Sequence, residues 1–469
     1  MTFLFFFVMF EGIFFATKLS VAQDLKVNMA FWQDNAGFAL EASSCKVLTD
    51  AKHYHSELLS LIGKAKKRIY IAALYLQDDT AGQGVLSALH NASLSNPDLE
   101  IKILVDFHRA QRGLIGEAKS EGNARLYCDY LEQFNSNVKV YGVPVKAKEL
   151  FGVLHLKGFV IDDTVLYSGA SINDVYLHQE ERYRLDRYFL LDNAKLADSF
   201  TAFIEKHLLN SEAVPRIDRR PLKPFSEIKL AQKKLMRSLK KANYDMSGAS
   251  ESNSLNVRAF LGFGRRTNKL NRLIKTLFDT TEQELILYTP YFNFPAPLLR
   301  SLRRLLKQGK SVTIVVGDKT ANDFYISPDK PFSRIGALPY LYERILHKFL
   351  KSQKRYIEQG LLNVYLWKDG DNSFHLKGIN QDNQVHLMTG HNLNPRAWGL
   401  DIENGILIED RDQELKSFID AEKQSILSQC RKLSGPDDIE TLQDYPAPVQ
   451  KILGQAKRVK VDFIIKKFI

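Results

Sequence analysis

Hydrophobic and polar positions alternate along the chain in two patterns: short apolar runs, and apolar positions at helical spacing. They predict a buried strand within residues 66–79, a helix over 84–92 and a second strand over 99–108, which together form a β-α-β unit. The same order of strand, helix and strand is predicted over residues 283–293, 298–309 and 311–319. This repetition predicts two copies of one α/β domain in tandem.

Matched residues keep nearly constant offsets between the two copies. Tyr75 matches Tyr291 (291 − 75 = 216), Asp106 matches Asp318 (318 − 106 = 212) and His155 matches His375 (375 − 155 = 220). We expect a first domain over residues 41–210 and a second over 251–445. The remaining segments are an N-terminal extension (1–40), a basic connector (211–250) and a basic amphipathic C-terminal tail (446–469).

The composition indicates a globular protein and leaves several kinds of partner open. A chain of 469 residues, 45% hydrophobic and 25% charged, can bury the cores of two domains. The net charge of +11 favours nucleic acid, acidic lipid or phosphorylated substrates without choosing among them. The three cysteines are too few and scattered for a disulfide framework or a zinc cluster, which indicates a reducing compartment.

Two segments concentrate the positive charge. Residues 215–242 carry ten Lys or Arg against Asp218 and Glu227, and form either a solvated linker helix or a basic face on anionic lipid. The C-terminal tail is typical of a helix that lies in a membrane interface or docks on the protein's own core. Its apolar residues at helical spacing are Ile452, Ala456, Val459 and Phe463.

The N-terminus is apolar from about Phe3 to Ala16, with Glu11 inside the run. A membrane span needs roughly 20 apolar residues, and a signal peptide would carry a basic residue before the run. We therefore expect a dispensable extension, with export or a loose surface anchor as the alternatives.

One polar trio occurs twice in strand-like surroundings. Alternate residues of a strand share a face, so His155 and Lys157 point the same way, as do His375 and Lys377. A nucleophile and a cation on one face can meet the same substrate atom. An Asp and a turn with Gly and Asn follow each pair: Asp162, Gly169, Ser171 and Asn173 in the first copy, and Asp382, Gly390, Asn392 and Asn394 in the second.

The doubled trio is the HxKxxxxD signature, and through it the chain resembles the phospholipase D superfamily. The resemblance implies two tandem α-β-α sandwich domains related by a pseudo-twofold axis, with one active site shared between them. It also implies covalent phosphoryl transfer, in which an unprotonated imidazole attacks phosphorus and a protonated one assists the leaving group. Lys157 and Lys377 would stabilise the non-bridging oxygens, so no metal ion or other cofactor is expected.

A carboxylate is expected to orient each imidazole through its second nitrogen. Glu403 stands 28 residues after His375 (403 − 375), where the superfamily usually places this acid. Asp186 stands 31 residues after His155 (186 − 155) and is the less regular assignment. Asn173 also lies one residue later after its Asp than Asn392 does, which leaves the hydrogen bonds of the first turn open.

Longer strings narrow the resemblance to the Gram-negative phosphatidylserine synthase family, from about residue 45 to the C-terminus. They include "VDFHRAQRG", "GVLHLKGFVIDDTVLYSGASINDVYLHQ", "VVGDKTANDFY" and "LNPRAWGLDIENGILI". The resemblance implies attack of a histidine on the diacylglycerol-linked phosphorus of CDP-diacylglycerol, release of CMP, and capture of the phosphatidyl group by the hydroxyl of L-serine. We favour His155 as nucleophile and His375 as acid and then base over the reverse.

The same resemblance implies where the protein works and what it binds. We expect a cytoplasmic protein that is peripherally associated with the anionic surface of the inner membrane, with no specific nucleic-acid partner, and leave the oligomeric state open. Arg109, Arg112 and Lys319 follow predicted strands and are candidates for the substrate diphosphate, with surface solubility as the alternative. The substrate-binding set is completed by Asn394 and by Tyr75 and Tyr291 as pocket walls.

Other activities would use the same trio. Cardiolipin synthases usually carry N-terminal transmembrane helices, and small phosphodiesterase nucleases carry one motif and dimerise, whereas this chain has two motifs. A phospholipase D hydrolase remains an alternative within the superfamily. A non-catalytic nucleic-acid-binding protein would share the basic surface but would have no reason to keep two intact trios.

Overall fold

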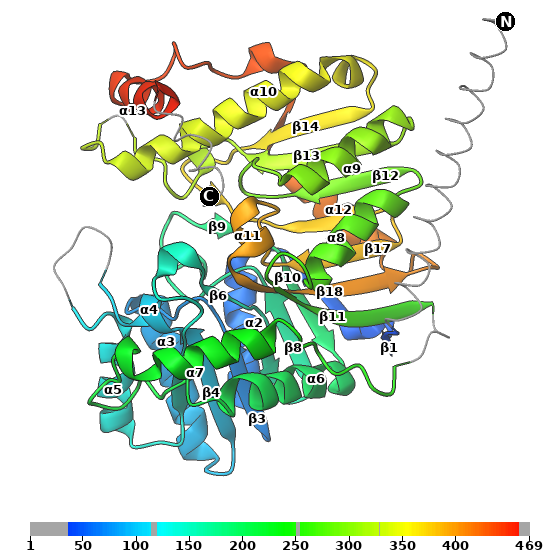
Figure 1. Cartoon of the computed structure of the whole chain (residues 1–469). Helices are drawn as coiled ribbons and strands as arrows, with labels where there is room; N and C mark the ends of the chain where they lie inside the picture. The colour runs from blue at the N-terminus through cyan, green and yellow to red at the C-terminus, as the bar shows by residue number, and fades with distance from the viewer. Residues whose placement is uncertain (1–35, 114–119, 250–253, 328, 459–469) are drawn as a thin grey trace, which may run out of the picture.

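The computed structural model describes residues 36–113, 120–249, 254–327 and 329–458. In this part of the chain, a seven-stranded and a ten-stranded mixed β-sheet form the centres of two halves (Figure 1). The N-terminal half lies below and the C-terminal half above in that view.

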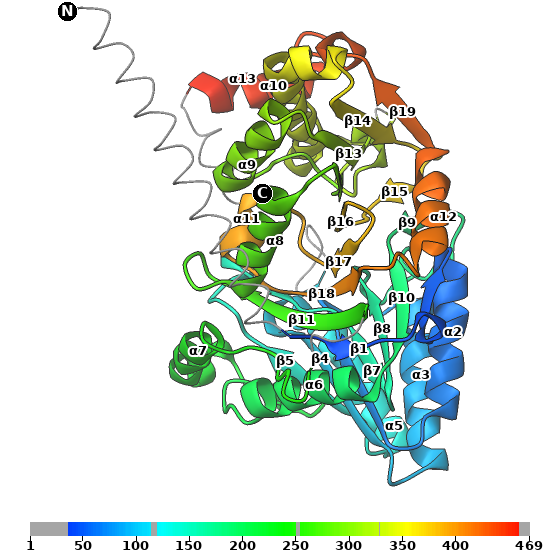
Figure 2. The same cartoon turned by 90° about the vertical axis from the view of Figure 1, so that its right-hand side faces the viewer.

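The first half has the strand order β2-β10-β8-β7-β3-β4-β5. Helices α2 (Ala51–Lys64), α3 (Thr80–Ser95) and α5 (Asn123–Phe134) cover one face of the sheet, and α6 (Ala194–Ile204) covers the other (Figure 2). The strands are β2 (Cys45–Leu48), β3 (Arg68–Ala72), β4 (Glu100–Asp106), β5 (Lys139–Val143), β7 (Phe159–Ile161), β8 (Thr164–Ser168) and β10 (Tyr188–Asp192).

The second half has the order β1-β11-β18-β17-β16-β12-β13-β14-β19, with β6 paired to β18. Helices α8 (Lys269–Thr280), α9 (Ala296–Lys307) and α10 (Leu338–Glu358) cover one face, and α12 (Lys416–Leu427) packs on the other. The strands are β1 (Phe38–Ala39), β11 (Leu255–Phe263), β12 (Glu284–Tyr288), β13 (Ser311–Gly317), β14 (Leu362–Trp367), β16 (Gly378–Gln381), β17 (Val385–Thr389), β18 (Ile402–Asp410) and β19 (Cys430–Leu433).

The predicted β-α-β repeat is confirmed. The first copy is β3, α3 and β4, and the second is β12, α9 and β13; the two strands of each unit are parallel. Strand β3 shows why the pattern was informative, because Ile69 and Ile71 face α2 and α3 whereas Tyr70 and Ala72 face the side covered by α6.

One hydrophobic core joins the two halves. Phe200 and Phe203 of α6 belong to the same buried cluster as Val257 of β11 and Ile406 of β18. The α6 face of the first sheet therefore packs on the β11 and β18 side of the second, and the halves form one body around this cluster.

The predicted connector contains helix α7 (Phe225–Leu239). It buries Ile228, Leu235 and Leu239 and exposes Lys229 and Lys233. The connector is thus a helix that is docked along one face and solvated along the other.

The terminal segments differ in part from the expectations. Phe38 and Leu40 are buried, and β1 pairs with β11, so the fold begins inside the segment that was expected to be an extension of residues 1–40. Residues 1–35 lie outside the described part of the chain. None of the helices in the described ranges is both long and apolar enough to span a membrane.

Helix α13 (Ala447–Arg458) occupies the start of the predicted amphipathic tail. Val449 and Leu453 are buried in one cluster with Tyr340 and Leu341 of α10. This part of the tail follows the alternative of docking on the protein's own core. Val459 and Phe463 lie outside the described residues.

Candidate active site

Reciprocal strand pairing brings the two trios together. Strand β6 (Leu154–His155) of the first half pairs in parallel with the start of β18, with His155 opposite Glu403. Strand β15 (Ser373–Phe374) of the second half pairs in parallel with β9 (Arg184–Leu185) of the first. Each histidine strand thus lies against the segment of the other half that carries a carboxylate.

The glycine turns confirm how closely the halves approach. A Cβ atom on Gly169 of the first half would lie 3.0 Å from Nζ of Lys377, and one on Gly390 of the second half would lie 3.1 Å from Cγ of Lys157. Such contacts leave little room for a side chain at either position. The turn of each half therefore packs directly on the lysine of the other half.

The first half-site is centred on His155, whose Nδ1 lies 2.8 Å from Oε2 of the fully buried Glu403. The next residue, Asn404, accepts a hydrogen bond from the backbone N–H of Lys157 and donates one to its carbonyl oxygen, both at 2.8 Å. No described residue hydrogen-bonds Nε2 of His155. The ring is fixed on one edge and available on the other.

The second half-site is more crowded. Nδ1 of His375 lies 2.9 Å from Oδ2 of Asp186, and Nζ of Lys377 donates to the same oxygen at 3.1 Å. Lys377 also contacts the imidazole itself. The hydroxyl of Tyr176 lies 3.0 Å from Nδ1 and 3.1 Å from Nε2 of His375.

The expected pairing of acids and histidines is therefore corrected. Glu403 contacts His155 and Asp186 contacts His375, so each acid orients the histidine of the other half rather than that of its own. The physical reason is the strand pairing of β6 with β18 and of β15 with β9, which joins segments 248 and 189 residues apart. The residue spacing within one half of the sequence could not predict this exchange of acids.

Burial shifts the protons of both half-sites in the same sense. It lowers the pKa of His155 and of His375, and the ammonium groups of Lys157 and Lys377 lower both further. Burial also raises the pKa of Glu403 and of Asp186, although the lysines oppose that shift. Each imidazole is thus neutral, with a proton held between Nδ1 and its carboxylate.

The aspartates of the two signatures lie outside the site, which corrects their catalytic assignment. Asp162 follows β7 and accepts hydrogen bonds from the backbone N–H groups of Lys66, Lys67 and Arg68, at the start of β3. Asp382 does the same for residues 282–284 at the start of β12. The histidines lie toward the opposite ends of these strands, so Asp162 and Asp382 position the fold and do not touch reacting atoms.

The asparagine assignments also change. Asn173 accepts a hydrogen bond from the N–H of Tyr176, and Asn394 accepts one from the N–H of Ala397 at the start of α11 (Pro395–Gly399). These two caps are equivalent, because each Asn lies four residues after its Gly. Asn394 is therefore a turn-capping residue rather than a substrate ligand.

Asn392, which was matched to Asn173, is instead the counterpart of Ser171. The hydroxyl of Ser171 accepts a hydrogen bond from Nζ of Lys157 at 3.2 Å. The buried Oδ1 of Asn392 has no hydrogen-bond partner among the described residues. Asn392 thus presents an available acceptor in the turn that packs on Lys157.

The two candidate arginines differ. The guanidinium of Arg109 lies over the ring of Tyr75, with 5.0 Å between Cζ and the ring centroid, and no described carboxylate pairs with it. Arg112 forms a bidentate ion pair with Glu149, from a segment 37 residues away. The assignment of Arg112 to the substrate diphosphate is therefore corrected, because Glu149 neutralises it, whereas Arg109 remains a candidate.

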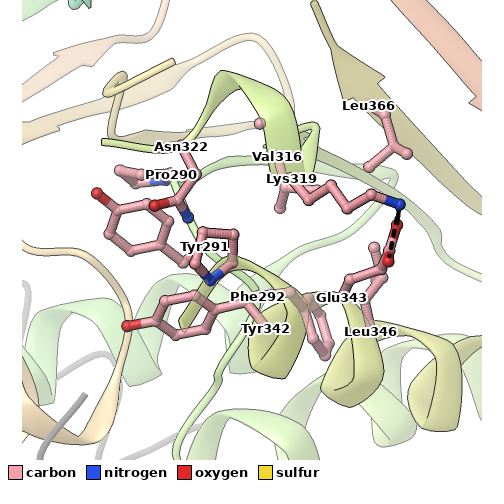
Figure 3. A pocket seen from close by; sticks show the side chains of 12 residues that line it. Pro290, Tyr291, Phe292, Val316, Lys319, Asn322, Tyr342, Glu343, Leu346 and Leu366 are labelled. Carbon is pink, nitrogen blue, oxygen red and sulfur yellow. Dashed lines mark hydrogen bonds and ion pairs between the residues drawn. The ribbon is translucent and has the colours of Figure 1, made fainter. Parts of the chain in front are cut away.

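Lys319 is also paired. Its Nζ pairs with Glu343 at 3.1 Å (Figure 3) and with Glu440 at 2.7 Å. With Tyr291, Asn322 and Tyr342 it lines a small cavity of about 20 Å³ beside β13. Tyr291 stacks on Tyr342 at 4.8 Å and is a wall of this cavity. Two carboxylates neutralise Lys319, so the assignment of Lys319 as a ligand of the substrate diphosphate is corrected.

Several residues of the site were missed from sequence. Tyr176, Arg184 and Asp323 lie around His375, and Asn404 holds the backbone of Lys157. Tyr176 and Asp323 lie within the strings quoted above, and Arg184 precedes Asp186 by two residues. Only the contacts between the two halves reveal their place in the site.

Known proteins share this arrangement. The family model described as "Cardiolipin synthase, PLD-like domain" matches residues 58–207 and 274–424, once in each half. The CDP-diacylglycerol--serine O-phosphatidyltransferase of Haemophilus influenzae is 45% identical over 433 residues, which cover 91% of this chain and 95% of that relative. The chain belongs to the phosphatidylserine synthase family of the phospholipase D superfamily.

Further members of this family agree. A CDP-diacylglycerol--serine O-phosphatidyltransferase of Escherichia coli is 45% identical over 419 residues, with 89% of this chain and 92% of the relative covered. The crystal structure of the Haemophilus influenzae phosphatidylserine synthase matches with a TM-score of 0.91 and 42% identity, covering 94% of this chain and all of that one. The expected fold of two tandem phospholipase D-like domains is confirmed.

Proposed function

We propose that the protein transfers the phosphatidyl group of CDP-diacylglycerol to the hydroxyl of L-serine and releases CMP. The observation that carries this proposal is the shared site. In it, two buried imidazoles are each hydrogen-bonded to a carboxylate of the opposite half, and two buried lysines lie beside them. The names of the 45% identical relatives supply the substrates.

In the first step, Nε2 of His155 attacks the phosphorus that carries diacylglycerol. A P–N bond forms as the bond from that phosphorus to the bridging oxygen of CMP breaks. A lone pair is available on Nε2 because the proton of this ring is held at Nδ1 by Glu403. Lys157 and Lys377 stabilise the negative charge of the non-bridging oxygens.

The leaving group needs little assistance from a general acid. CMP departs as a phosphate monoester, whose second pKa is about 6. A neutral His375 in the free protein is compatible with this step, and the negative charge of a bound diphosphate raises the pKa of a neighbouring imidazole.

In the second step, the serine hydroxyl is a poor nucleophile and needs a general base. His375 accepts its proton as the oxygen forms a bond to phosphorus and the P–N bond to His155 breaks. This restores His155 and releases phosphatidylserine. Water would give phosphatidic acid by the same route, so serine must be held in preference to water.

We also propose that the protein works in the cytoplasm and docks on the anionic surface of the inner membrane. Helix α7 presents an exposed basic face made of Lys229, Lys233, Lys234 and Arg237 together with the exposed Leu230, and the exposed Lys240 and Lys241 follow directly after the helix. A lipid substrate with two acyl chains requires such docking, and each basic residue contributes about 1 kcal/mol at an anionic surface. The three cysteines are free thiols, as a reducing compartment allows.

The test supplies CDP-diacylglycerol with serine, glycerol, phosphatidylglycerol or water in turn and identifies the lipid product. We expect phosphatidylserine and stoichiometric CMP with serine. Phosphatidic acid in every reaction would identify a hydrolase, and cardiolipin as the main product would identify a cardiolipin synthase. His155→Ala and His375→Ala should each abolish CMP release while circular dichroism shows an unchanged fold; full activity in either would contradict the shared site.

A further inference from the structure

An ion pair between the two halves lies next to His375. Arg184 of β9 contacts Asp323, which follows the short helix η4 (Lys319–Ala321), with 2.8 Å between Nε and Oδ1. The guanidinium stacks on the ring of Tyr176 at 4.6 Å, and the hydroxyl of Tyr176 contacts His375. One aromatic side chain, that of Tyr176, thus separates the ion pair from His375, the general base proposed for the serine hydroxyl.

This ion pair is more accessible than a structural pair at the same boundary. The side chains of Arg184 and Asp323 are each 14% exposed, whereas those of Arg187 and Glu422 are 3% and 10% exposed. The hydroxyl of Tyr291 donates to Oδ2 of Asp323 at 3.2 Å. Oδ1 is buried and, despite its contact with Arg184, accepts no aligned hydrogen bond from a described residue, so its capacity as an acceptor is unused.

The pseudo-twofold relation breaks at this position. Arg184 precedes Asp186 by two residues, as Asp401 precedes Glu403. Asp401 accepts hydrogen bonds from the backbone N–H of Val153 and from Arg396, both at 2.9 Å. The His155 side therefore has a carboxylate, paired with Arg396, where the His375 side has a guanidinium, paired with Asp323. The sign of the charged group at this position differs between the half-sites, which suits them to different parts of the substrates.

We propose that Arg184 and Asp323 bind the α-carboxylate and the α-ammonium of the acceptor L-serine. An α-amino acid carries both groups on one carbon, so it is complementary to a guanidinium and a carboxylate that lie side by side. Binding there brings the hydroxyl of serine next to His375, which removes its proton. The diphosphate of the lipid donor suits this pair less well, because the carboxylate of Asp323 repels it. The inference rests on the proposed transfer to serine.

The first test separates the two half-reactions. Exchange of labelled CMP into CDP-diacylglycerol needs no serine and reports only the first step. In Arg184→Gln and in the isosteric Asp323→Asn, we expect this exchange to stay within about threefold of the wild type. The KM for serine should rise roughly 10- to 150-fold, as expected for the loss of a hydrogen bond to a charged group.

The second test uses acceptors that lack one charge. Ethanolamine has no carboxylate and 3-hydroxypropionate has no ammonium. Arg184→Gln should lower kcat/KM for serine and leave that for ethanolamine unchanged, whereas Asp323→Asn should lower kcat/KM for serine and leave that for 3-hydroxypropionate unchanged. This crossed pattern is not expected if the ion pair only stabilises the fold.

Arg258→Gln is the matched control. Arg258 of β11 also forms a buried ion pair, with Glu409 of β18 at 2.6 Å, and this pair lies away from the two histidines. It should lower the melting temperature without changing the KM for serine. If Arg184→Gln does not fold, Asp323→Asn carries the test. An unchanged KM for serine in a folded variant, or a loss of exchange parallel to the loss of transfer, overturns the inference. A wild-type protein that performs CMP exchange but does not use serine overturns the proposed function instead.

Discussion

The two lysines of the site differ in how their charges are balanced. Lys377 lies 3.1 Å from the carboxylate of Asp186, whereas Nζ of Lys157 donates to the hydroxyl of Ser171 and the carbonyl of Ala170 at 3.2 and 3.3 Å. Burial, followed by the repulsion of Lys377, lowers the pKa of Lys157 to about 7. The charge of Lys157 in the free protein thus depends on pH in the physiological range.

This difference predicts an alkaline limit for substrate capture. An amine is charged below its pKa, so Lys157 loses its charge as the pH rises through about 7. We expect kcat/KM for CDP-diacylglycerol, which reports the free enzyme, to fall above that pH, and kcat to fall less because bound phosphate raises the pKa. In Lys157→Arg, whose guanidinium stays charged, the alkaline limb should move to higher pH. An unmoved limb would assign the titration to another group.

At the scale of elements, the sequence predicted the features that depend on residues close together in the chain. The alternation of apolar residues predicted β3, α3 and β4 and their second copies, because each element buries its own face. The exchange of Glu403 and Asp186 between the half-sites was not predictable, because the pairing of β6 with β18 depends on residues about half a chain away. Asn173 was matched to Asn392 instead of Asn394, because equivalent positions in the turn are counted from its glycine and not from Asp162.

The correction of the signature aspartates can be tested at this scale. The carboxylate of Asp382 accepts three backbone hydrogen bonds of 2.8 Å at the start of β12. Asp382→Ala removes these three hydrogen bonds to a charged acceptor, two from exposed residues and one from the half-buried Glu284, and should lower the free energy of unfolding by about 1–3 kcal/mol. The kcat of the folded fraction should stay within a fewfold of the wild type. A large loss of kcat with unchanged stability would return Asp382 to the catalytic group.

At the scale of the whole molecule, the active site exists only where the two halves meet. Each half supplies a histidine and the acid that orients the other histidine, and a single buried cluster holds the halves together. The basic face of α7, located in the connector between the halves, adds a surface for anionic lipid. Sequence duplication predicted the two halves, but the contacts that complete the site required their packing.

The lipid-docking surface predicts a salt-dependent affinity for vesicles. Neutralising Lys229, Lys233 and Lys234 with Gln should weaken co-sedimentation with anionic vesicles by roughly 1 kcal/mol per residue. The loss should be largest at low ionic strength, because salt screens exposed charges. Lys64, Lys66 and Lys67, which are exposed on the first half, provide a matched triple Gln control. Equal effects of the two triple variants would show that net charge, and not α7, controls docking.

The central claim is that one covalent intermediate forms in a site shared by both halves. The most direct measurement is rapid mixing with CDP-diacylglycerol in the absence of serine, an alkaline denaturing quench and mass spectrometry of the histidine peptides. The account predicts a phosphatidyl adduct on His155 that disappears on addition of serine and is absent from His155→Ala. An adduct on a residue outside the two trios, or CMP release without any adduct, would contradict it.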